Sequence, residues 1–403
     1  MTAAAAPTRQ ADPLVVAIAY LGFIVLGIPG ALLGVATPSI RENFALTLDT
    51  FGLLFIATTS GYFLASVISG RLFARFGAAA IFGASAVVSA VGLLGYIISP
   101  SWLIMLAFGV VAGLGAGLLD AGMNIYFAAH FGPRLMNWLH ACFGIGATIG
   151  PLLMTFILNA GGTWRTGYIM VGGLYGGLAL LFFLTQARWG GGAPQSKTDA
   201  PAPVSASAQE TLRLPIVWVG ILLFIAYAGL EMSAGQWAFS LFTEARSVDQ
   251  NTAGLWVSIY WGSFTVGRIV FGAIVTYVKP ATLIRACTGL VLVGALLLWW
   301  NPIPESGLIA LSLYGFALAP IFALLVTNTQ DTLGPKHGPN AIGFQVGAAS
   351  LGLGVLPGLI GVLAEATGSL EVVPPILLVL VAIMAILYEL THNPRLAHVR
   401  DDG

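Results

Sequence analysis

Charged side chains are scarce in this chain. Of its 403 residues only 8% are Asp, Glu, Lys or Arg, whereas an ordinary soluble domain carries about a quarter. So few charges cannot cover the surface of a water-soluble protein, and that class is excluded. The formal net charge is zero, which leaves no basic face for nucleic acid. We therefore do not expect nucleic acid as a partner.

Cysteine and the motifs of enzymes are also rare. Cys142 and Cys287 are the only cysteines, and both lie inside long apolar stretches, which is typical of small buried residues rather than of a disulfide or metal pair. The sequence has no His or Asp cluster at metal-ligand spacing, no phosphate loop and no nucleophile motif. We therefore expect no enzymatic activity, no metal site and no cofactor.

Apolar residues, by contrast, make up 58% of the chain and occur in long runs. A spanning helix needs roughly 20 apolar residues, because its backbone must satisfy its own hydrogen bonds inside the bilayer. The first run is too long for a signal-peptide core, so we expect the N-terminus to be retained. Twelve runs predict an all-α membrane protein: 14–39, 51–70, 78–98, 102–127, 136–158, 166–186, 214–239, 252–278, 281–300, 307–328, 341–366 and 372–390.

Residues 189–213 differ from the rest, because Gly, Pro, Ala and Ser dominate there and leave little to bury. We predict a flexible linker between six-helix bundles at 14–188 and 214–390, with cytoplasmic tails at 1–13 and 391–403. Cytoplasmic loops are enriched in Lys and Arg. With the N-terminus inside, only Arg41, Arg165 and Arg246 face outward. This bias predicts a multi-pass protein of the cell (inner) membrane with both termini cytoplasmic.

The second six runs repeat the first. A shift of 202 positions without a gap places Gly27 on Gly229 and Gly70 on Gly272; Gly52-Leu53 and Gly132-Pro133 also find matches at Gly254-Leu255 and Gly334-Pro335. Parallel six-helix repeats are the arrangement of the major facilitator superfamily, with the substrate site between the halves near the midplane. The loop GRLFARFGAAA also resembles that superfamily, since Gly70, Leu72, Arg75 and Gly77 match its loop pattern, although Ala74 replaces the usual acidic residue.

Four ionisable residues lie within the apolar runs: Asp120, His140, Glu231 and Arg268. Such a residue costs about 3 kcal/mol or more in a bilayer and faces a cavity or a partner by default. At a rise of about 1.5 Å per residue, Asp120 and Arg268 reach similar depths and can approach one another. Glu231 lies roughly 10 Å away along the normal, which argues against a Glu231–Arg268 pair. We predict that Asp120, Glu231 and Arg268 take part in proton coupling.

A structural role stays open for each of these residues. Asp120 can be a fixed ion-pair partner, His140 a packing residue, Glu231 a wall of the vestibule and Arg268 an anchor. Trp237 and Trp261 can stack on a sugar ring or belong to the membrane interface. The predicted substrate contacts are Asn124, Asn137, His140, Glu231, Gln236, Trp237, Trp261 and Gln345.

Several helices resemble the fucose:proton symporter family. The matching elements are Asp120 and Asn124 in the fourth helix, Asn137 and His140 in the fifth, Tyr227, Gly229, Glu231 and Trp237 in the seventh, Tyr260, Trp261, Gly262, Gly267 and Arg268 in the eighth, and Pro320, Ile321 and Phe322 in the tenth. The resemblance implies a sugar carrier in which Asp120 couples protons. Sugar-transporting members also have an acidic residue and an Asn on the first helix, where this chain has Gly30 and Gly34.

We expect a secondary transporter that couples protons to the symport of a sugar or similar small polar solute by alternating access. Its partners are then the solute, protons and the lipid bilayer, and a monomer is sufficient. Export or flipping of amphiphilic compounds is the alternative within the same fold, and the apolar first helix suits it. A non-transporting membrane sensor or scaffold is the alternative of another class.

Overall fold

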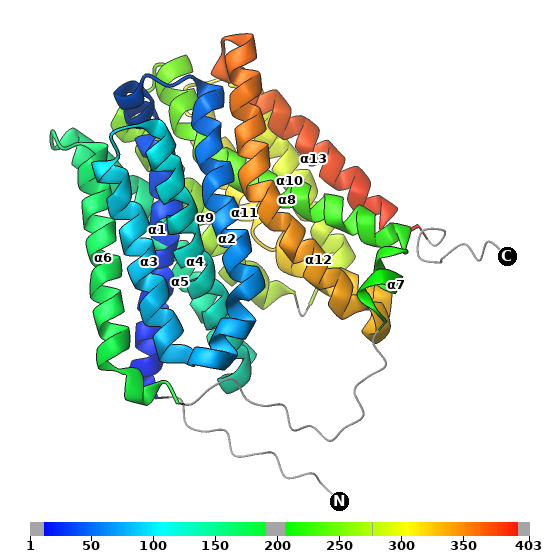
Figure 1. The fold of residues 1–403 in the computed structure, drawn as a ribbon. Coiled ribbons are helices and arrows are strands. Elements are labelled where there is room, and N and C mark those ends of the chain that lie inside the picture. Colours follow the sequence, from blue (N-terminus) through cyan, green and yellow to red (C-terminus); the bar gives the residue numbers. More distant parts are fainter. Residues whose placement is uncertain (1–11, 191–205, 276, 394–403) are drawn as a thin grey trace, which may run out of the picture.

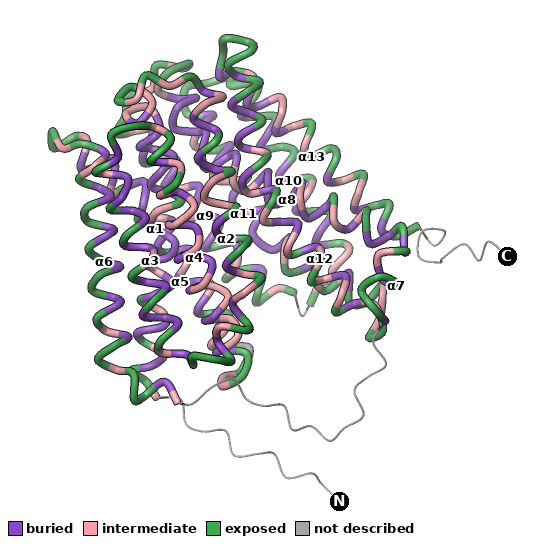
Figure 2. The backbone as a smooth tube through the Cα atoms, in the orientation of Figure 1, coloured by how far each residue is buried: buried purple, intermediate pink, exposed green. Residues whose placement is uncertain are grey.

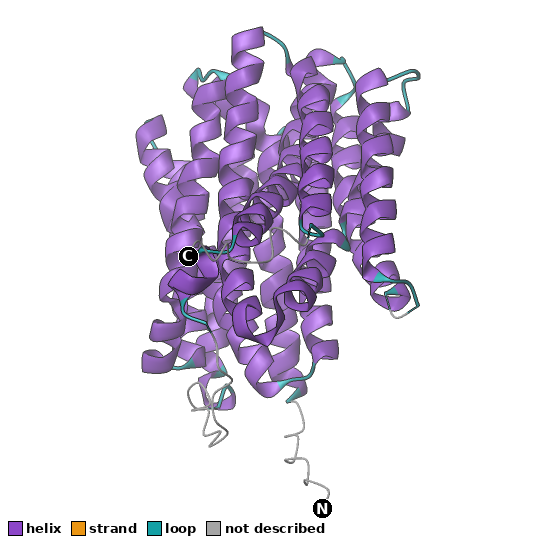
Figure 3. Ribbon diagram, turned by 90° about the vertical axis from the view of Figure 1, so that its right-hand side faces the viewer, coloured by secondary structure: helices purple, strands orange, loops and turns teal. Residues whose placement is uncertain are grey.

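The computed structural model describes residues 12–190, 206–275 and 277–393. Every regular element in these ranges is a helix (Figure 3), so the predicted all-α class is confirmed. The tails predicted at 1–13 and 391–403 lie almost wholly outside the described residues, as does the central part of the predicted linker.

Six long helices form the first half of the chain. They are α1 Pro13–Phe44, α2 Leu48–Phe76, α3 Ala78–Ile98, α4 Trp102–His130, α5 Pro133–Asn159 and α6 Trp164–Leu184, followed by the short η1 Gln186–Arg188. We call the membrane face at which α1 begins and α6 ends the proximal face, and the opposite one the distal face. The Asp12 carboxylate caps α1 by accepting from the Leu14 N–H at 3.0 Å, and Arg188 beyond α6 pairs with Asp12 at 3.1 Å.

The second half follows the same plan. Its helices are α7 Ala208–Leu212, α8 Pro215–Ser240 with the π-helical turn η2 Leu241–Ala245, α9 Gln250–Ile274, α10 Pro280–Trp300, α11 Ser306–Leu318, α12 Ile321–Thr367, η3 Leu370–Val372 and α13 Val373–Leu390. Figure 1 shows α1, α3, α4, α5 and α6 toward one side of the molecule and α8, α10, α12 and α13 toward the other. We propose the predicted bundle limits, 14–188 and 214–390, as the domain boundaries.

Eleven helical stretches of the described chain are long and apolar enough to cross a membrane. One of them, Ser306–Thr367, has 62 residues, which would be about three bilayer thicknesses if straight. Gly334 breaks it with φ 63°, a conformation that L side chains rarely adopt. This stretch therefore contains two of the twelve predicted spans. Exposed residues cover the outside of the bundle (Figure 2), and many are large and apolar, such as Leu103 and Phe156, as lipid contact requires.

Glycine brings neighbouring helices into backbone contact. A Cβ atom on Gly27 of α1 would lie 2.1 Å from the Phe143 carbonyl oxygen of α5, and one on Gly146 of α5 would lie 1.9 Å from that of Ile24. Helices α2 and α4 make the same kind of contact: a Cβ atom on Gly61 of α2 or on Gly113 of α4 would lie within about 2 Å of a carbonyl oxygen of the other helix. Small residues allow such close packing in membranes, where helices gain little from hydrophobic association.

The predicted linker 189–213 is ordered at both described ends. Trp189 is buried against the rings of Phe82 and Phe182. Removing its large apolar surface from water stabilises this packed position. At the other end, α7 is a single helical turn. Its Ser207 accepts from the Glu210 N–H, and the Ser207 N–H donates to the Glu210 carboxylate, which holds the pKa of that carboxyl below its usual range.

An arginine joins three segments on the distal face of each half. In the first half, Arg165 at the start of α6 donates to Asn43 near the end of α1 at 2.8 Å and to the Ile97 carbonyl near the end of α3 at 3.2 Å. In the second half, Arg246 lies after η2 and donates to Glu371 in η3 at 2.7 Å and to the Leu298 carbonyl of α10 at 2.9 Å. In each half the arginine thus connects the distal ends of the first, third and sixth spanning helices.

We expect the substitution Gly146→Val to lower the thermal unfolding midpoint in detergent by several degrees. The added side chain would separate α1 from α5, and overpacking of this kind costs about 1–3 kcal/mol. Gly176→Val is the matched control, because a Cβ there meets nothing within 4 Å. Equal midpoints for the two variants would contradict the glycine packing.

Candidate functional site

A cavity of about 1440 Å³ lies between the two halves. Its walls come from α1, α2, α4 and α5 on one side and from α8, α9 and α12, with Leu283 of α10, on the other. The lining reaches Arg134 and Trp138 at the start of α5 and Val275 after α9, which all lie toward the proximal face. The cavity therefore opens to the proximal face.

The two halves meet on the distal face. Arg41 at the end of α1 pairs with Glu244 of η2 at 2.8 Å, and the Leu48 N–H of α2 donates to Glu365 of α12 at 2.9 Å. Asn159 of α5 and Asn251 of α9 also form a hydrogen bond. These contacts close the distal side while the proximal side is open, as one state of an alternating-access carrier requires.

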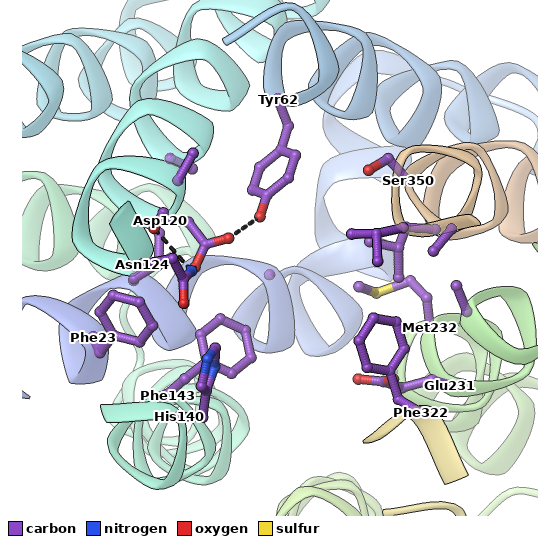
Figure 4. Close-up of a pocket in the computed structure, with 18 of the residues that line it drawn as sticks. Phe23, Tyr62, Asp120, Asn124, His140, Phe143, Glu231, Met232, Phe322 and Ser350 are labelled. Carbon is purple, nitrogen blue, oxygen red and sulfur yellow. Dashed lines mark hydrogen bonds between the residues drawn. The ribbon is translucent and has the colours of Figure 1, made fainter. Parts of the chain in front are cut away.

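Asp120 lies on the first-half wall of the cavity (Figure 4). The Tyr62 hydroxyl of α2 donates to one of its carboxylate oxygens, and the Asn124 amide, one turn further along α4, donates to the other at 3.1 Å. The sequence analysis missed Tyr62. The internal repeat contained a signal for Tyr62: the 202-residue shift places Phe264 opposite it, so only the first half has a hydroxyl at this position.

Arg268 does not pair with Asp120 in this structure. The ion pairs of the described residues within 4.0 Å involve neither residue, because the open cavity separates the two walls at this depth. The Arg268 guanidinium lies 4.5 Å above the Phe264 ring, and its charge acts on His140 and on Glu231.

Glu231 and Arg268 lie on the same wall of the cavity. Both line the cavity, their charges interact, and the Tyr227 hydroxyl lies beside both. A Glu231–Arg268 ion pair within 4.0 Å is absent among the described residues, and α8 continues through η2 to Ala245. The second-half wall therefore carries a carboxylate with a nearby cation.

The fifth helix contributes polar groups close to the cavity mouth. His140 packs edge-on against Phe23 of α1, with ring centroids 5.7 Å apart, and Asp120 also acts on it electrostatically. Asn137, about one turn earlier, is exposed in the mouth. Both residues line the cavity, and their predicted roles as substrate contacts stay predictions.

Three predicted substrate contacts lie outside the cavity lining in this structure. Trp237 is fully buried, and its indole N–H donates to the Pro357 carbonyl at 2.9 Å. Trp261 packs on Gly235, where a Cβ would lie 2.5 Å from its ring. Gln345 is buried and accepts from the Thr329 hydroxyl at 2.8 Å. Polarity along the sequence does not reveal that these side chains point into helix contacts.

Gln236 lines the cavity and also joins the halves. Its amide donates to the Gly30 carbonyl of α1 at 2.7 Å. Gly30 is the position where a polar side chain would be expected from the resemblance to sugar carriers, and its backbone oxygen supplies the polar group instead. The first helix otherwise presents apolar residues to the cavity, among them Pro29 and Leu33.

Comparison with known proteins identifies the family. The sequence profile of the Major Facilitator Superfamily matches residues 19–338 and 238–401. The chain belongs to the major facilitator superfamily. It is therefore a multi-pass membrane transporter and not an enzyme. Membership also accounts for the two six-helix halves and for the cavity between them.

Individual relatives of this superfamily member are distant. "Sodium-dependent glucose transporter 1A" of Mus musculus is 25% identical over 377 residues, which cover 85% of this chain and 88% of the relative. "Sodium-dependent glucose transporter 1" of Homo sapiens is 24% identical over 387 residues, with 87% and 74% covered.

Solved structures of the superfamily share the fold. A bacterial homologue of the human lysosomal transporter Spinster matches with a TM-score of 0.76 at 14% identity, over 96% of this chain and 97% of the other. The E. coli fucose:proton symporter matches with a TM-score of 0.62 at 17% identity, over 94% and 98%.

We expect Glu244→Gln to populate a state with an open distal side. An ion pair on the surface contributes about 0.2–1 kcal/mol, so its loss shifts the ratio of the two states roughly 1.4- to 5-fold. The measurement is the distance between spin labels on two introduced cysteines, Ser101→Cys and Glu305→Cys. These exposed positions lie at the distal ends of the two halves. The native cysteines are buried.

The matched control is Glu389→Gln, which breaks an ion pair of 2.7 Å with Arg285 inside the second half. Its distance distribution should equal that of the parent protein. If Glu244→Gln shows the same distribution as this control, the pair is not part of the distal closure.

Proposed function

We propose that the protein is a secondary transporter that couples protons to the symport of a sugar or a similar small polar solute. The observation that carries this proposal is Asp120 in the wall of the central cavity, held by Tyr62 and Asn124 and without an ion-pair partner among the described residues. An ionisable residue at this depth is costly and marks a transport pathway by default.

The charges of the cavity support electroneutral coupling. On the second-half wall, the negative charge of Glu231 is offset by Arg268. Asp120 then contributes a net negative charge on the other wall, which one bound proton removes. A neutral solute and one proton together leave the inner part of the cavity, beyond Arg134 at its opening, without net charge. This lowers the cost of closing the cavity inside a low-dielectric membrane.

The hydrogen-bonding groups of the cavity suit a polyhydroxylated solute. Amide, imidazole and carboxylate groups face the space from both walls, at Asn124, Asn137, His140, Glu231 and Gln236. Specific sites in proteins combine a few polar groups of this kind with apolar walls. The names of the glucose transporter relatives and of the fucose:proton symporter of similar fold support a sugar as the solute.

Proton coupling is favoured over sodium coupling by the groups around Asp120. The glucose transporter relatives are named as sodium-dependent. Hard metal cations prefer a shell of oxygen ligands. Asp120 is instead approached by an O–H and an N–H donor, from Tyr62 and Asn124. Donors stabilise a carboxylate but compete with a bound cation.

The Lys and Arg distribution supports a cytoplasmic location of both termini in the cell membrane. The proximal face is then the cytoplasmic face, and the cavity of this structure is open to the cytoplasm. We propose a monomer, because one chain contains both halves and the complete cavity between them.

Export of an amphiphilic compound is the second candidate. It is favoured by the apolar part of the first-half wall, where α1 presents Leu26, Pro29 and Leu33. Proteoliposomes with an imposed pH gradient distinguish the two functions, because a symporter concentrates the solute with the inward proton flow and an exporter moves it in the opposite direction.

We expect Asp120→Asn to abolish solute accumulation driven by a pH gradient while solute counterflow continues. The amide is similar in shape but cannot release a proton, so binding and exchange remain and coupling is lost. The measurement is uptake of labelled sugars into proteoliposomes, with a pH gradient and, separately, with a sodium gradient.

Asp331→Asn is the control, since Asp331 is an exposed carboxylate outside the cavity lining. Accumulation should equal that of the parent protein. Undiminished pH-driven accumulation by Asp120→Asn would remove the coupling role. Accumulation by the parent protein with the sodium gradient alone would replace protons by sodium as the coupling ion.

A further inference from the structure

Helix α1 borders the central cavity along one of its faces. We call the residues of this face the α1 stripe: Phe23, Leu26, Pro29, Gly30 and Leu33. Residues three and four apart lie on the same side of a helix, and at a rise of about 1.5 Å per residue the stripe is about 15 Å long. None of its side chains can donate or accept a hydrogen bond. The stripe is therefore an apolar surface inside a cavity whose other walls carry polar side chains.

The polar side chains of the cavity come from other helices, with Tyr62 on α2, Asn124 on α4, His140 on α5 and Glu231 on α8. Phe23, at one end of the stripe, packs against His140 with ring centroids 5.7 Å apart, so polar and apolar surfaces adjoin. A solute in contact with both meets hydrogen-bonding groups on one side and apolar atoms on the other. Hydroxyls placed against the stripe would leave water without finding a new partner, which costs free energy.

Gly30 leaves a recess in the α1 stripe. A Cβ atom there would meet no atom within 4 Å, and the residue is exposed although it lies near the middle of a long helix. The stripe residues on either side, Pro29 and Leu33, carry apolar side chains that also line the cavity. The missing side chain of Gly30 therefore leaves an apolar gap that opens into the cavity.

Helix packing accounts for the other glycines of α1 but not for Gly30. A Cβ atom on Gly27 would lie 2.1 Å from a carbonyl oxygen of α5, and one on Gly34 would lie 2.8 Å from a carbonyl oxygen of α8. One on Gly22 would touch a side chain of α6 at 3.7 Å. Glycine weakens the interior of a helix relative to alanine. No helix contact compensates for this loss at Gly30, and the space that it leaves belongs to the transport pathway.

The second half places an adaptable apolar side chain next to the recess. Met232 of α8 points into the cavity from the other wall (Figure 4). The Gln236 amide donates to the Gly30 carbonyl at 2.7 Å and contacts the Met232 sulfur at 3.3 Å, so one amide joins the two positions. The 202-residue shift also places Gly30 opposite Met232. The unbranched methionine side chain can adjust its shape to an apolar group beside it.

We propose that the recess between Gly30 and Met232 binds an apolar group of the solute, and that the solute is a glycoside, a sugar joined to an apolar substituent. The hydroxyls of the sugar bind the polar side chains of α4 and α5, and the substituent lies against the α1 stripe. The proposal rests on the sugar symport proposed above and narrows its substrate class. A glycoside of this kind carries no charge, so it also fits the charge balance of the cavity.

Binding of paired glycosides to the full-length protein tests the proposal. The protein is held in lipid nanodiscs, because maltoside detergents are themselves apolar glycosides. The probes are the methyl and phenyl β-glycosides of D-glucose and of L-fucose, and the members of each pair differ only in the substituent. We expect the phenyl glycoside of at least one sugar to bind about tenfold more tightly than its methyl partner, because the ring removes more apolar surface from water.

The variant Gly30→Leu should remove this preference. The leucine side chain fills the recess, so the two glycosides should bind within about twofold of each other, and the methyl glycoside should keep the parent affinity within about threefold. Gly30→Ala is the milder change. It adds one carbon that meets no atom and raises helix propensity, so the fold is retained, and the phenyl preference should fall about threefold.

Gly173→Leu is the matched control. Gly173 of α6 is exposed outside the cavity lining, and a Cβ there also meets nothing within 4 Å. This variant should keep the phenyl preference of the parent protein. Equal affinities of the parent protein for the methyl and phenyl glycosides would overturn the proposal. A lack of binding by all four probes, or a phenyl preference that survives Gly30→Leu, would overturn it as well.

Uptake into proteoliposomes separates this proposal from the proposed function. An inward proton gradient should drive accumulation of the phenyl glycoside by the parent protein. If Gly30→Leu removes a phenyl preference in binding but no pH-driven uptake occurs, the symport is overturned and the apolar subsite is retained. If methyl and phenyl glycosides accumulate equally and bind equally, the symport is retained and the subsite is overturned.

Discussion

The bilayer core offers no water to backbone groups, and the structure depends on this constraint. Each span must be a helix that satisfies its own hydrogen bonds. Helices that gain little from hydrophobic association then hold together through close contact, and glycines such as Gly27, Gly61, Gly113 and Gly146 bring backbones together within each half. Because these contacts are rigid, each half can move as a body, and the space between the halves becomes the transport pathway.

The polar groups are distributed unequally over this repeated scaffold. The first half presents Asp120 with Tyr62 and Asn124, and the second half presents Glu231 with Arg268. The 202-residue shift places Phe322 opposite Asp120 and Phe264 opposite Tyr62. The repeat provides the geometry of the carrier, whereas the positions at which the two halves differ provide its chemistry.

The sequence predicted the fold better than the site. Hydropathy alone located the twelve spans, because length and apolarity decide membrane insertion. It gives the depth of a residue but not the direction of its side chain around the helix, so Trp237, Trp261 and Gln345 were assigned to a cavity that they do not line. The length of the seventh span was also underestimated, because the turn η2 extends α8 to Ala245, beyond the apolar run predicted to end at residue 239.

The arginine joints of the distal face show how the two halves relate. One half places the arginine at the start of its sixth spanning helix, and the other places it in the loop after its first, with Glu371 as the acceptor. The same three segments are tied together, with donor and acceptor exchanged between them. The two halves therefore share the connection between these segments but not the residues that make it. The 202-residue shift finds no match for either arginine, since Arg165 falls on Thr367 and Arg246 on Phe44, although the same segments are connected in both halves.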